Sequence, residues 1–406
     1  MALETPTWMN LCFVEKILRK SEGDNSIQVT DVFTKPATNK GDNYTSDMFR
    51  VNIEFTHGQD ENKITDKKSI IIKVAPIAEG VRQDLIEKAD LFGVEILMMT
   101  DTLKKMNKLL EPKYRVSGKC LYVQKNPTLL VIEDLAVLGF RMACRQSGLD
   151  LDHCVLALRG LARFHAASVA ICEKEPNHKN IYTKGMFSAD YPTNFRSFFI
   201  QSTHILAKEA ENWPEVKRYV GKLSNLADRI YQIGIDMCKV SEDEFNVITH
   251  GDFWVNNMLF KYNNEGKPIE HIMVDFQICK YSTPAIDLHY FFNTSPAPVV
   301  YENHKSVLLN EYCNTLASTM KQLNCKTRPP TMEELKTSLK RRAAYGMIAA
   351  FTVLPLMLIE KDNVKDLDEI MGKDGSVENP AYKNEAYRKV ITKRIPLYDE
   401  WGLLDP

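Results

Sequence analysis

The stretch that decides the fold reads VITHGDFWVNNMLF at residues 247–260 and continues as IMVDFQ at residues 272–277. An apolar strand end leads into a turn that carries Asp252, and Asn257 follows five residues later. A second apolar run then ends at Asp275. The pattern predicts that three oxygen-bearing side chains converge at the ends of two short strands.

The order of these residues is that of the catalytic and metal-binding loops of kinases, with a hairpin turn at residues 263–266 between them. Phosphoryl transfer needs a carboxylate that orients the attacking hydroxyl and oxygen ligands that hold the metal on the triphosphate. Asp252 is therefore the predicted catalytic base, and Asn257 and Asp275 are the predicted Mg²⁺ ligands. A single His-Gly-Asp or Asp-Phe group is usually an ordinary turn, so the prediction depends on the combined spacing.

A nucleotide-binding lysine is expected upstream, and Lys73 ends the β-branched run at residues 69–74. Lysines next to strands usually extend into water, so this residue alone means little. A helix expected from Asp84 to Leu97 carries Glu95 among apolar residues. Glu95 is the predicted ion-pair partner of Lys73.

Two further segments are expected to contact the nucleotide. The polar run at residues 39–46 lies between two predicted strands, so Gly41, Asn43 and Ser46 are candidates for covering the phosphates. The run has one glycine where Gly-rich kinase loops have three, and taken by itself it is better explained as an ordinary hairpin turn.

A second hairpin is expected where residues 120–124 and 129–132 flank Lys125-Asn126-Pro127. In a two-lobed kinase the chain crosses between the lobes directly after such a hairpin, and its backbone contacts the adenine edge. Glu133 and Leu135 are the candidates for this contact. A plain exit from a strand into a loop is the alternative.

With these elements in this order, the chain resembles the ecdysteroid-kinase-like (choline-kinase-like) family of insect proteins, within the group of aminoglycoside and choline phosphotransferases. The resemblance runs from about residue 10 to the C-terminus. Its most distinctive pieces are IEDL at residues 132–135, LARFHA at residues 161–166, HGDFW at residues 250–254 and VDFQ at residues 274–277.

The resemblance implies a role for each matching residue. Lys73, held by Glu95, would pair with the α- and β-phosphates of ATP, and His250 would shape the catalytic loop. Asp287 would brace this loop from beneath, although its position also suits an N-cap of the following helix. His165 lies on an apolar helix expected at residues 151–172, where a histidine is usually a core residue, so it is not among the predicted catalytic residues.

Two departures from protein kinases favour a small-molecule substrate. Gln277 stands where protein kinases carry glycine, and Gly251 where they carry arginine. Without that arginine, no switch through a phosphorylated activation loop is expected. An Ala-Pro-Glu segment, which protein substrates usually need, is also missing after Asp275.

Composition agrees with an α+β, two-lobed protein-kinase-like fold. A chain of 406 residues is long enough for two lobes with separate cores. The order of the motifs predicts an N-terminal nucleotide-gripping lobe at residues 1–132 and a helical catalytic and acceptor-binding lobe at residues 133–406. A net charge of -1 argues against a nucleic-acid partner. The apolar run at residues 343–359 is slightly short for a membrane span and is expected to be a buried helix. We expect a monomer.

The nine cysteines include no Cys-x-x-Cys pair, and the N-terminus lacks the features of a signal peptide, so a cytoplasmic location is expected. Aromatic residues are dense in the segment 174–246, which suggests an apolar acceptor pocket, although each one taken singly is better explained as helix core. They are Tyr182, Phe187, Tyr191, Phe195, Phe198, Phe199, Trp213 and Tyr219.

The predicted function is an ATP- and Mg²⁺-dependent kinase of a lipophilic alcohol, with an ecdysteroid as the most specific candidate. The alternatives are a detoxifying kinase of xenobiotic or glycosylated alcohols, a choline- or ethanolamine-type kinase, and a catalytically inactive relative that binds a nucleotide or a sterol.

Overall fold

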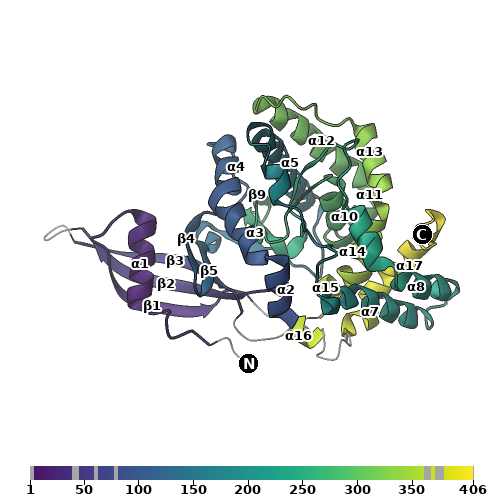
Figure 1. Cartoon of the computed structure of the whole chain (residues 1–406), viewed down its shortest axis with the longest axis horizontal. Helices are drawn as coiled ribbons and strands as arrows, with labels where there is room; N and C mark the ends of the chain where they lie inside the picture. The colour runs from purple at the N-terminus through teal and green to yellow at the C-terminus, as the bar shows by residue number, and fades with distance from the viewer. Residues whose placement is uncertain are drawn as a thin grey trace.

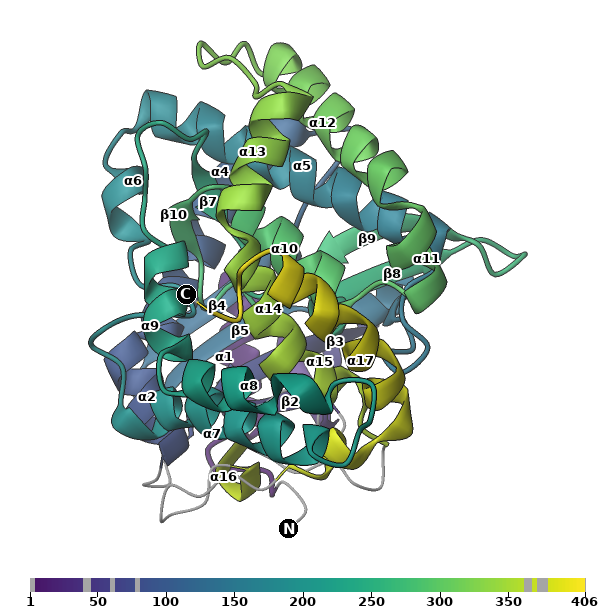
Figure 2. The ribbon, with the colours of Figure 1, turned by 90° about the vertical axis from the view of Figure 1, so that its right-hand side faces the viewer.

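The computed structural model describes residues 4–38, 45–58, 63–76, 81–360, 367–370 and 379–405. A small lobe built on strands lies beside a larger lobe made mainly of helices (Figure 1 and Figure 2). This arrangement confirms the predicted α+β class. The strands are β1 (Gln28–Pro36), β2 (Asp47–His57), β3 (Ile64–Val74), β4 (Cys120–Lys125), β5 (Thr128–Glu133), β6 (Phe140–Met142), β7 (Val247–Thr249), β8 (Met258–Tyr262), β9 (Pro268–Met273) and β10 (Lys280–Ser282).

The helices of the small lobe and the crossing region are α1 (Leu11–Glu22), α2 (Val81–Ala89), α3 (Leu91–Leu97), α4 (Leu103–Leu110) and a short 3₁₀ turn at Leu135–Leu138. Those that follow are α5 (Leu151–Lys174), α6 (His178–Ile181), α7 (Thr193–Ala210), α8 (Val220–Ala227), α9 (Ile230–Met237), α10 (Ala285–Thr294), α11 (Pro298–Asn303), α12 (Lys305–Gln322), α13 (Met332–Arg341), α14 (Ala343–Thr352), α15 (Leu354–Leu358), α16 (Leu367–Ile370) and α17 (Glu385–Glu400).

The small lobe is an antiparallel sheet in the order β1-β2-β3-β5-β4, with α1 packed against it. Alternate residues of β2 are buried, as the period of a strand requires. They form one apolar core with Val14, Ile17 and Leu18 of α1. Burial of this face holds the helix on the sheet.

Lys73 lies near the end of β3, the middle strand of this sheet. It stands opposite Met48 of β2 on one side and Leu130 of β5 on the other. The residues before it, Ile70 to Ile72, are buried, and Lys73 itself is only 2% exposed. A lysine at this depth needs compensating charges within the protein.

The predicted single helix from Asp84 to Leu97 is wrong, because the chain forms α2 and α3 with a break between them. The break lies at Asp90, whose φ of 55° is left-handed. A Cβ atom at position 93 would lie 2.3 Å from a carboxylate oxygen of Asp90, so a larger residue there would require the Asp90 side chain to move. A π-helical turn at Met98–Thr102 then joins α3 to α4. The break directs α2 towards the large lobe.

The large lobe places the catalytic segment between α5 and α10. The predicted hairpin is confirmed as β8 and β9, which pair antiparallel, and β7 pairs with β10 next to it. The predicted helix at residues 151–172 is confirmed as α5. In the described part of the chain, α5 alone is long and apolar enough to cross a membrane, but 78% of its apolar window is buried inside the protein.

The apolar run at residues 343–359 forms α14 and α15, and α14 is buried against α10. This run is therefore part of the core of the large lobe. β5 ends at Glu133, beside the division between residues 132 and 133, and this division of the chain into lobes remains our proposal.

Candidate active site

The catalytic loop begins where β7 ends. The φ of Gly251 is 85°, and a Cβ atom there would lie 2.2 Å from the carbonyl oxygen of Ile278. A side chain at this position would therefore collide with backbone. Burial lowers the pKa of His250, which keeps its ring neutral. Its Nδ1 can then accept the N–H of Asp252 at 3.3 Å, while Nε2–H donates to the carbonyl of Val274 at 3.1 Å.

Asp287 holds this loop from α10. Its carboxylate accepts the backbone N–H of His250 at 2.7 Å and that of Gly251 at 2.8 Å. The alternative role of Asp287 as a helix N-cap is wrong, because Pro284 occupies that position and Asp287 lies inside the first turn. The two hydrogen bonds from backbone N–H groups hold the loop against α10, as expected if Asp287 supports the loop.

His165 belongs to the same network, which the sequence did not reveal. Its Nε2 lies 3.0 Å from Asp287 Oδ2, and its Nδ1 lies 2.8 Å from the hydroxyl of Tyr312 on α12. His165, Asp287 and Tyr312 are fully buried. His165 is a core residue, as expected, but one that positions the carboxylate under the catalytic loop.

Asp252 and Asn257 are in direct contact. The side-chain amide of Asn257 donates to the carbonyl oxygen and to Oδ2 of Asp252, both at 2.9 Å. Burial raises the pKa of Asp252 to about 7, a hydrogen bond from Tyr290 opposes this rise, and the nearby charge of Asp275 adds to it. A carboxylate with such a pKa can accept a proton near neutral pH.

Tyr290 is a site residue that sequence reasoning missed. It lies on α10 three residues after Asp287, and residues at this spacing share a helix face. The predicted helix and Asp287 together could therefore have identified Tyr290 as a candidate.

Asp275, Lys73 and Glu95 meet on the other side of the loop. The ammonium of Lys73 lies 2.6 Å from Glu95 Oε2, as predicted, and 2.5 Å from Asp275 Oδ1. Burial disfavours the charge of Lys73, but Asp275 and Glu95 more than compensate and raise its pKa. Burial raises the pKa of Glu95, and Lys73 opposes this. The lysine therefore stays charged between two carboxylates.

A cavity of about 370 Å³ opens between the lobes beside these residues. Glu133 and Leu135, the predicted crossing residues, line it, and the Glu133 carboxylate accepts from Arg115 at 2.8 Å. Other predicted residues on the lining are Lys73, Glu95, Asn257 and Asp275. The structure thus brings these six predicted residues to one cavity between the lobes.

The phosphate-covering role of Gly41, Asn43 and Ser46 stays a prediction. Gly41 and Asn43 lie outside the described residues. Ser46 is buried before β2 and is not part of the described lining of this cavity.

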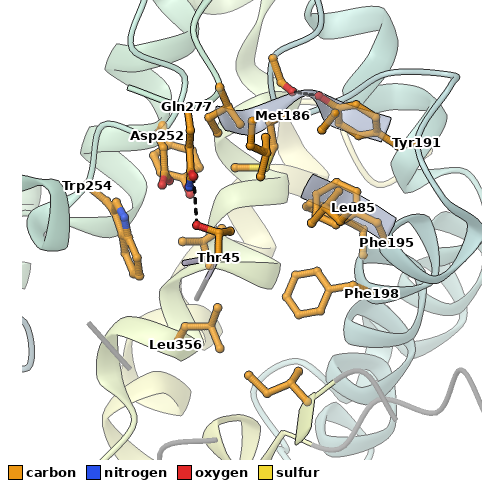
Figure 3. Close-up of a pocket in the computed structure, with 18 residues that line it drawn as sticks. Thr45, Leu85, Met186, Tyr191, Phe195, Phe198, Asp252, Trp254, Gln277 and Leu356 are labelled. Atoms are coloured by element: carbon orange, nitrogen blue, oxygen red, sulfur yellow. Dashed lines mark hydrogen bonds between the residues drawn. The ribbon is translucent and has the colours of Figure 1, made fainter. Parts of the chain in front are cut away.

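A second cavity, of about 140 Å³, is lined by Asp252. Figure 3 shows Asp252, Gln277 and Thr45 on one side of it, across from Tyr191, Phe195 and Phe198. The remaining lining is Leu85, Ala89, Leu91, Gly185, Met186, Phe199, Trp254, Ile278, Tyr290, Val353, Leu356 and Ile370.

Half of the aromatic residues noted in the segment 174–246 line this second cavity. The four lining residues are Tyr191, Phe195, Phe198 and Phe199. The other four, for which packing in the helix core was the simpler explanation, belong to the apolar core of the large lobe: Tyr182, Phe187, Trp213 and Tyr219. The small lobe also contributes Leu85, Ala89 and Leu91 to the lining. Sequence reasoning missed these residues because their position depends on the break at Asp90.

Gln277 lies between the two cavities. Its Oε1 accepts from the hydroxyl of Thr45 at 3.0 Å, the contact drawn in Figure 3, and its Nε2 donates to Asp275 Oδ2 at 3.3 Å. Gln277 therefore links the small lobe to the Asp275 carboxylate on the cavity between the lobes.

A model of the ecdysteroid kinase-like family matches residues 40–325, and none of the curated proteins matches the chain. Among solved structures, an ethanolamine kinase of Plasmodium vivax is 11% identical, with a TM-score of 0.39 over 87% of this chain and 92% of that one.

Two other structures are similarly distant. A choline/ethanolamine kinase family protein of Mesorhizobium loti is 13% identical, with a TM-score of 0.38 over 87% of each chain. An amicoumacin kinase in complex with AMP-PNP and Ca²⁺ is 14% identical, with a TM-score of 0.38 over 84% of this chain and 86% of that one. These TM-scores are low, so the assignment depends on the family model, whose match spans more than half of the sequence. The chain belongs to the ecdysteroid kinase-like family and is a phosphotransferase that acts on a hydroxyl group of a small molecule.

Proposed function

We propose that the chain is an ATP- and Mg²⁺-dependent kinase of a lipophilic alcohol. One observation carries this proposal: the two cavities meet at the contact between Asp252 and Asn257. Asp252 lines the apolar cavity, Asn257 lines the cavity between the lobes, and their side chains are 2.9 Å apart. A donor phosphate and an acceptor hydroxyl held in these cavities would be brought together at the base.

The nucleotide would occupy the cavity between the lobes. Lys73 would contact its phosphates, held in place by the ion pair with Glu95. The backbone near Glu133 and Leu135 would contact the base. The apolar residues Ile71 and Leu259 on the lining suit a flat aromatic ring.

The donor set suits a divalent metal. Asp275 and Asn257 present carboxylate and amide oxygens on the same cavity, and the amide nitrogen of Asn257 is already committed to Asp252. Mg²⁺ is typically bound by one or two such groups together with water and substrate phosphates. When bound, the ion would neutralise charge on the phosphates.

Asp252 would orient the acceptor and take its proton. The acceptor oxygen forms a bond to the γ-phosphorus, and the bond from this phosphorus to the β,γ-bridging oxygen breaks. The hydroxyl proton passes to the Asp252 carboxylate, and the products are a phosphate ester and ADP. The pKa of about 7 suits this carboxylate for accepting the proton.

The acceptor is proposed to be lipophilic because aromatic and aliphatic residues form most of the second cavity. Within this class an ecdysteroid is the most specific candidate, since the family carries that name. We also propose that the enzyme is a monomer and is located in the cytoplasm.

An ADP-release screen with mass detection of the phosphate ester tests this function. The acceptors are ecdysteroids, apolar and xenobiotic alcohols, glycosylated phenols, choline and ethanolamine, with Asp252→Asn as the inactive control. Transfer to apolar alcohols is expected. Preferential transfer to choline would refute the lipophilic acceptor but not the kinase, and nucleotide binding without any transfer would favour the inactive relative.

A further inference from the structure

The apolar cavity has an unusual distribution of charge. Asp252 is the one carboxylate on its described lining, which holds no lysine, arginine or histidine. All other side chains of the described lining are apolar or uncharged. An acceptor with a charged group at the far end would therefore lose its hydration and gain no partner of opposite charge among the described lining residues.

The polar side chains of this lining are largely committed to partners within the protein. The Tyr191 hydroxyl donates to the carbonyl of Gly185 at 2.5 Å. Thr45 donates to Gln277, which itself donates to Asp275.

Asp252 is the exception among these groups. Its Oδ2 accepts from Asn257, and Tyr290 is hydrogen-bonded to its carboxylate. A carboxylate has about four lone-pair sites, so Asp252 can accept a further donor. The Trp254 indole N–H, for which the described residues show no hydrogen bond, is the other open polar group.

Volume sets a second limit on the acceptor. The cavity measures about 140 Å³. Sites that enclose a whole drug-sized ligand usually measure about 300–1,000 Å³. A large acceptor would therefore place only one segment in this cavity, with the rest of the molecule outside.

We propose that the acceptor enters this cavity as an uncharged, apolar segment that carries a single hydroxyl, and that this hydroxyl donates to Asp252. The proposal rests on the proposed kinase function and narrows its substrate class. Selection is set by the groups next to the reacting hydroxyl, whatever the remainder of the molecule is. A second hydroxyl on the buried segment would lose its bonds to water against the apolar wall.

A matched series of small acceptors tests this selection: hexanol, its α,ω-diol and its ω-amino derivative. The wild-type enzyme should use hexanol best. A hydroxyl placed against an apolar pocket is typically rejected about 100-fold or less, so kcat/KM for the diol should be roughly ten- to a hundredfold lower. The amino alcohol should be poorer still, because none of the described lining residues away from Asp252 offers its ammonium a carboxylate.

Leu356 offers a matched pair of variants, since it lines the cavity away from Asp252 (Figure 3). Leu356→Asn adds a donor and an acceptor to the wall and should raise kcat/KM for the diol relative to hexanol. Leu356→Met keeps the wall apolar and should leave this ratio as in the wild type.

The outcomes separate the selection from the kinase function. Equal or greater kcat/KM for the diol or the amino alcohol in the wild type overturns the single-hydroxyl proposal, while transfer itself still supports the kinase. If none of the three is phosphorylated, their dissociation constants from intrinsic tryptophan fluorescence decide, since Trp254 lines the cavity. Tightest binding of hexanol supports the selection, and any other order overturns it. Failure of the whole acceptor screen would count against the kinase alone.

Discussion

Replacing Lys73 by methionine should destabilise the protein as well as impair nucleotide binding. The ammonium is the positive charge between Glu95 and Asp275, at 2.6 Å and 2.5 Å. Lys73 and Glu95 are only 2% and 3% exposed, so water cannot replace the lost partner. Methionine keeps the apolar stem and a similar volume, which isolates the effect of the charge.

Loss of one partner from a buried ion pair typically costs about 3–5 kcal/mol, because the other charge stays buried without compensation. We expect a loss of this size for Lys73→Met near pH 8. Glu95→Gln alone leaves Lys73 paired with Asp275 and should cost less. The double variant should be more stable than Lys73→Met, since it removes one of the two uncompensated carboxylates.

The pH dependence has a definite sign. Burial raises the pKa of Glu95, and loss of Lys73 removes the charge that opposes this rise. An acid whose pKa is higher in the folded protein than in the unfolded chain favours folding less as the pH rises through that range. The difference between wild type and Lys73→Met should therefore be smaller near pH 5.5 than near pH 8.

Thermal unfolding of the wild type, Lys73→Met, Glu95→Gln and the double variant at both pH values measures these effects. Calorimetry with ATP and Mg²⁺ measures nucleotide affinity. Lys73→Met should bind ATP more weakly than the wild type at a temperature where both are folded. Equal stability and equal ATP affinity of the two proteins would refute the role of the buried cation.

Three further results are expected. Asp252→Asn should lower kcat by roughly a hundred- to ten-thousandfold with little change in ATP affinity, measured by steady-state kinetics with a confirmed acceptor; near-wild-type turnover would rule out this base. Asp275→Ala should abolish the Mg²⁺ dependence of ATP binding in calorimetric titrations, and retained dependence would place the metal elsewhere. The pKa of Asp252 is about 7, and the base acts only when its carboxyl is deprotonated. The value of kcat/KM should therefore fall about tenfold per pH unit well below pH 7, whereas a flat profile down to about pH 5.5 would contradict the assignment.

Much of the fold and site could be predicted because the relevant residues lie on or beside short, strongly patterned strands. Lys73 follows a β-branched run, and Asp275 follows an apolar one. A strand fixes the direction of its end residue, so a sequence pattern translates directly into position. The pairing of Lys73 with Glu95 was predictable for a similar reason, since Glu95 lies among apolar residues in the second half of the predicted helix.

The contacts that could not be predicted join residues far apart in the chain. His165 and Asp287 are separated by 122 residues, and Thr45 and Gln277 by 232. Local periodicity carries no information about such pairs. The break at Asp90 was also hidden, because apolar residues continue on both sides of it in the sequence.

Gly251 links the geometry of the site to how the enzyme can be regulated. Arginine at this position is what protein kinases use to bind a phosphorylated activation loop. Here the backbone of Gly251 has a φ of 85°, and any Cβ atom would lie 2.2 Å from the carbonyl oxygen of Ile278. An arginine could be accommodated only if the segment after Asp275 moved away. That segment carries Gln277, which is hydrogen-bonded to both Asp275 and Thr45, so such a movement would disturb the nucleotide side and the acceptor side together. The close approach of Gly251 to Ile278 thus explains why arginine does not fit at this position in this structure, and the absence of a phosphorylation switch stays a prediction.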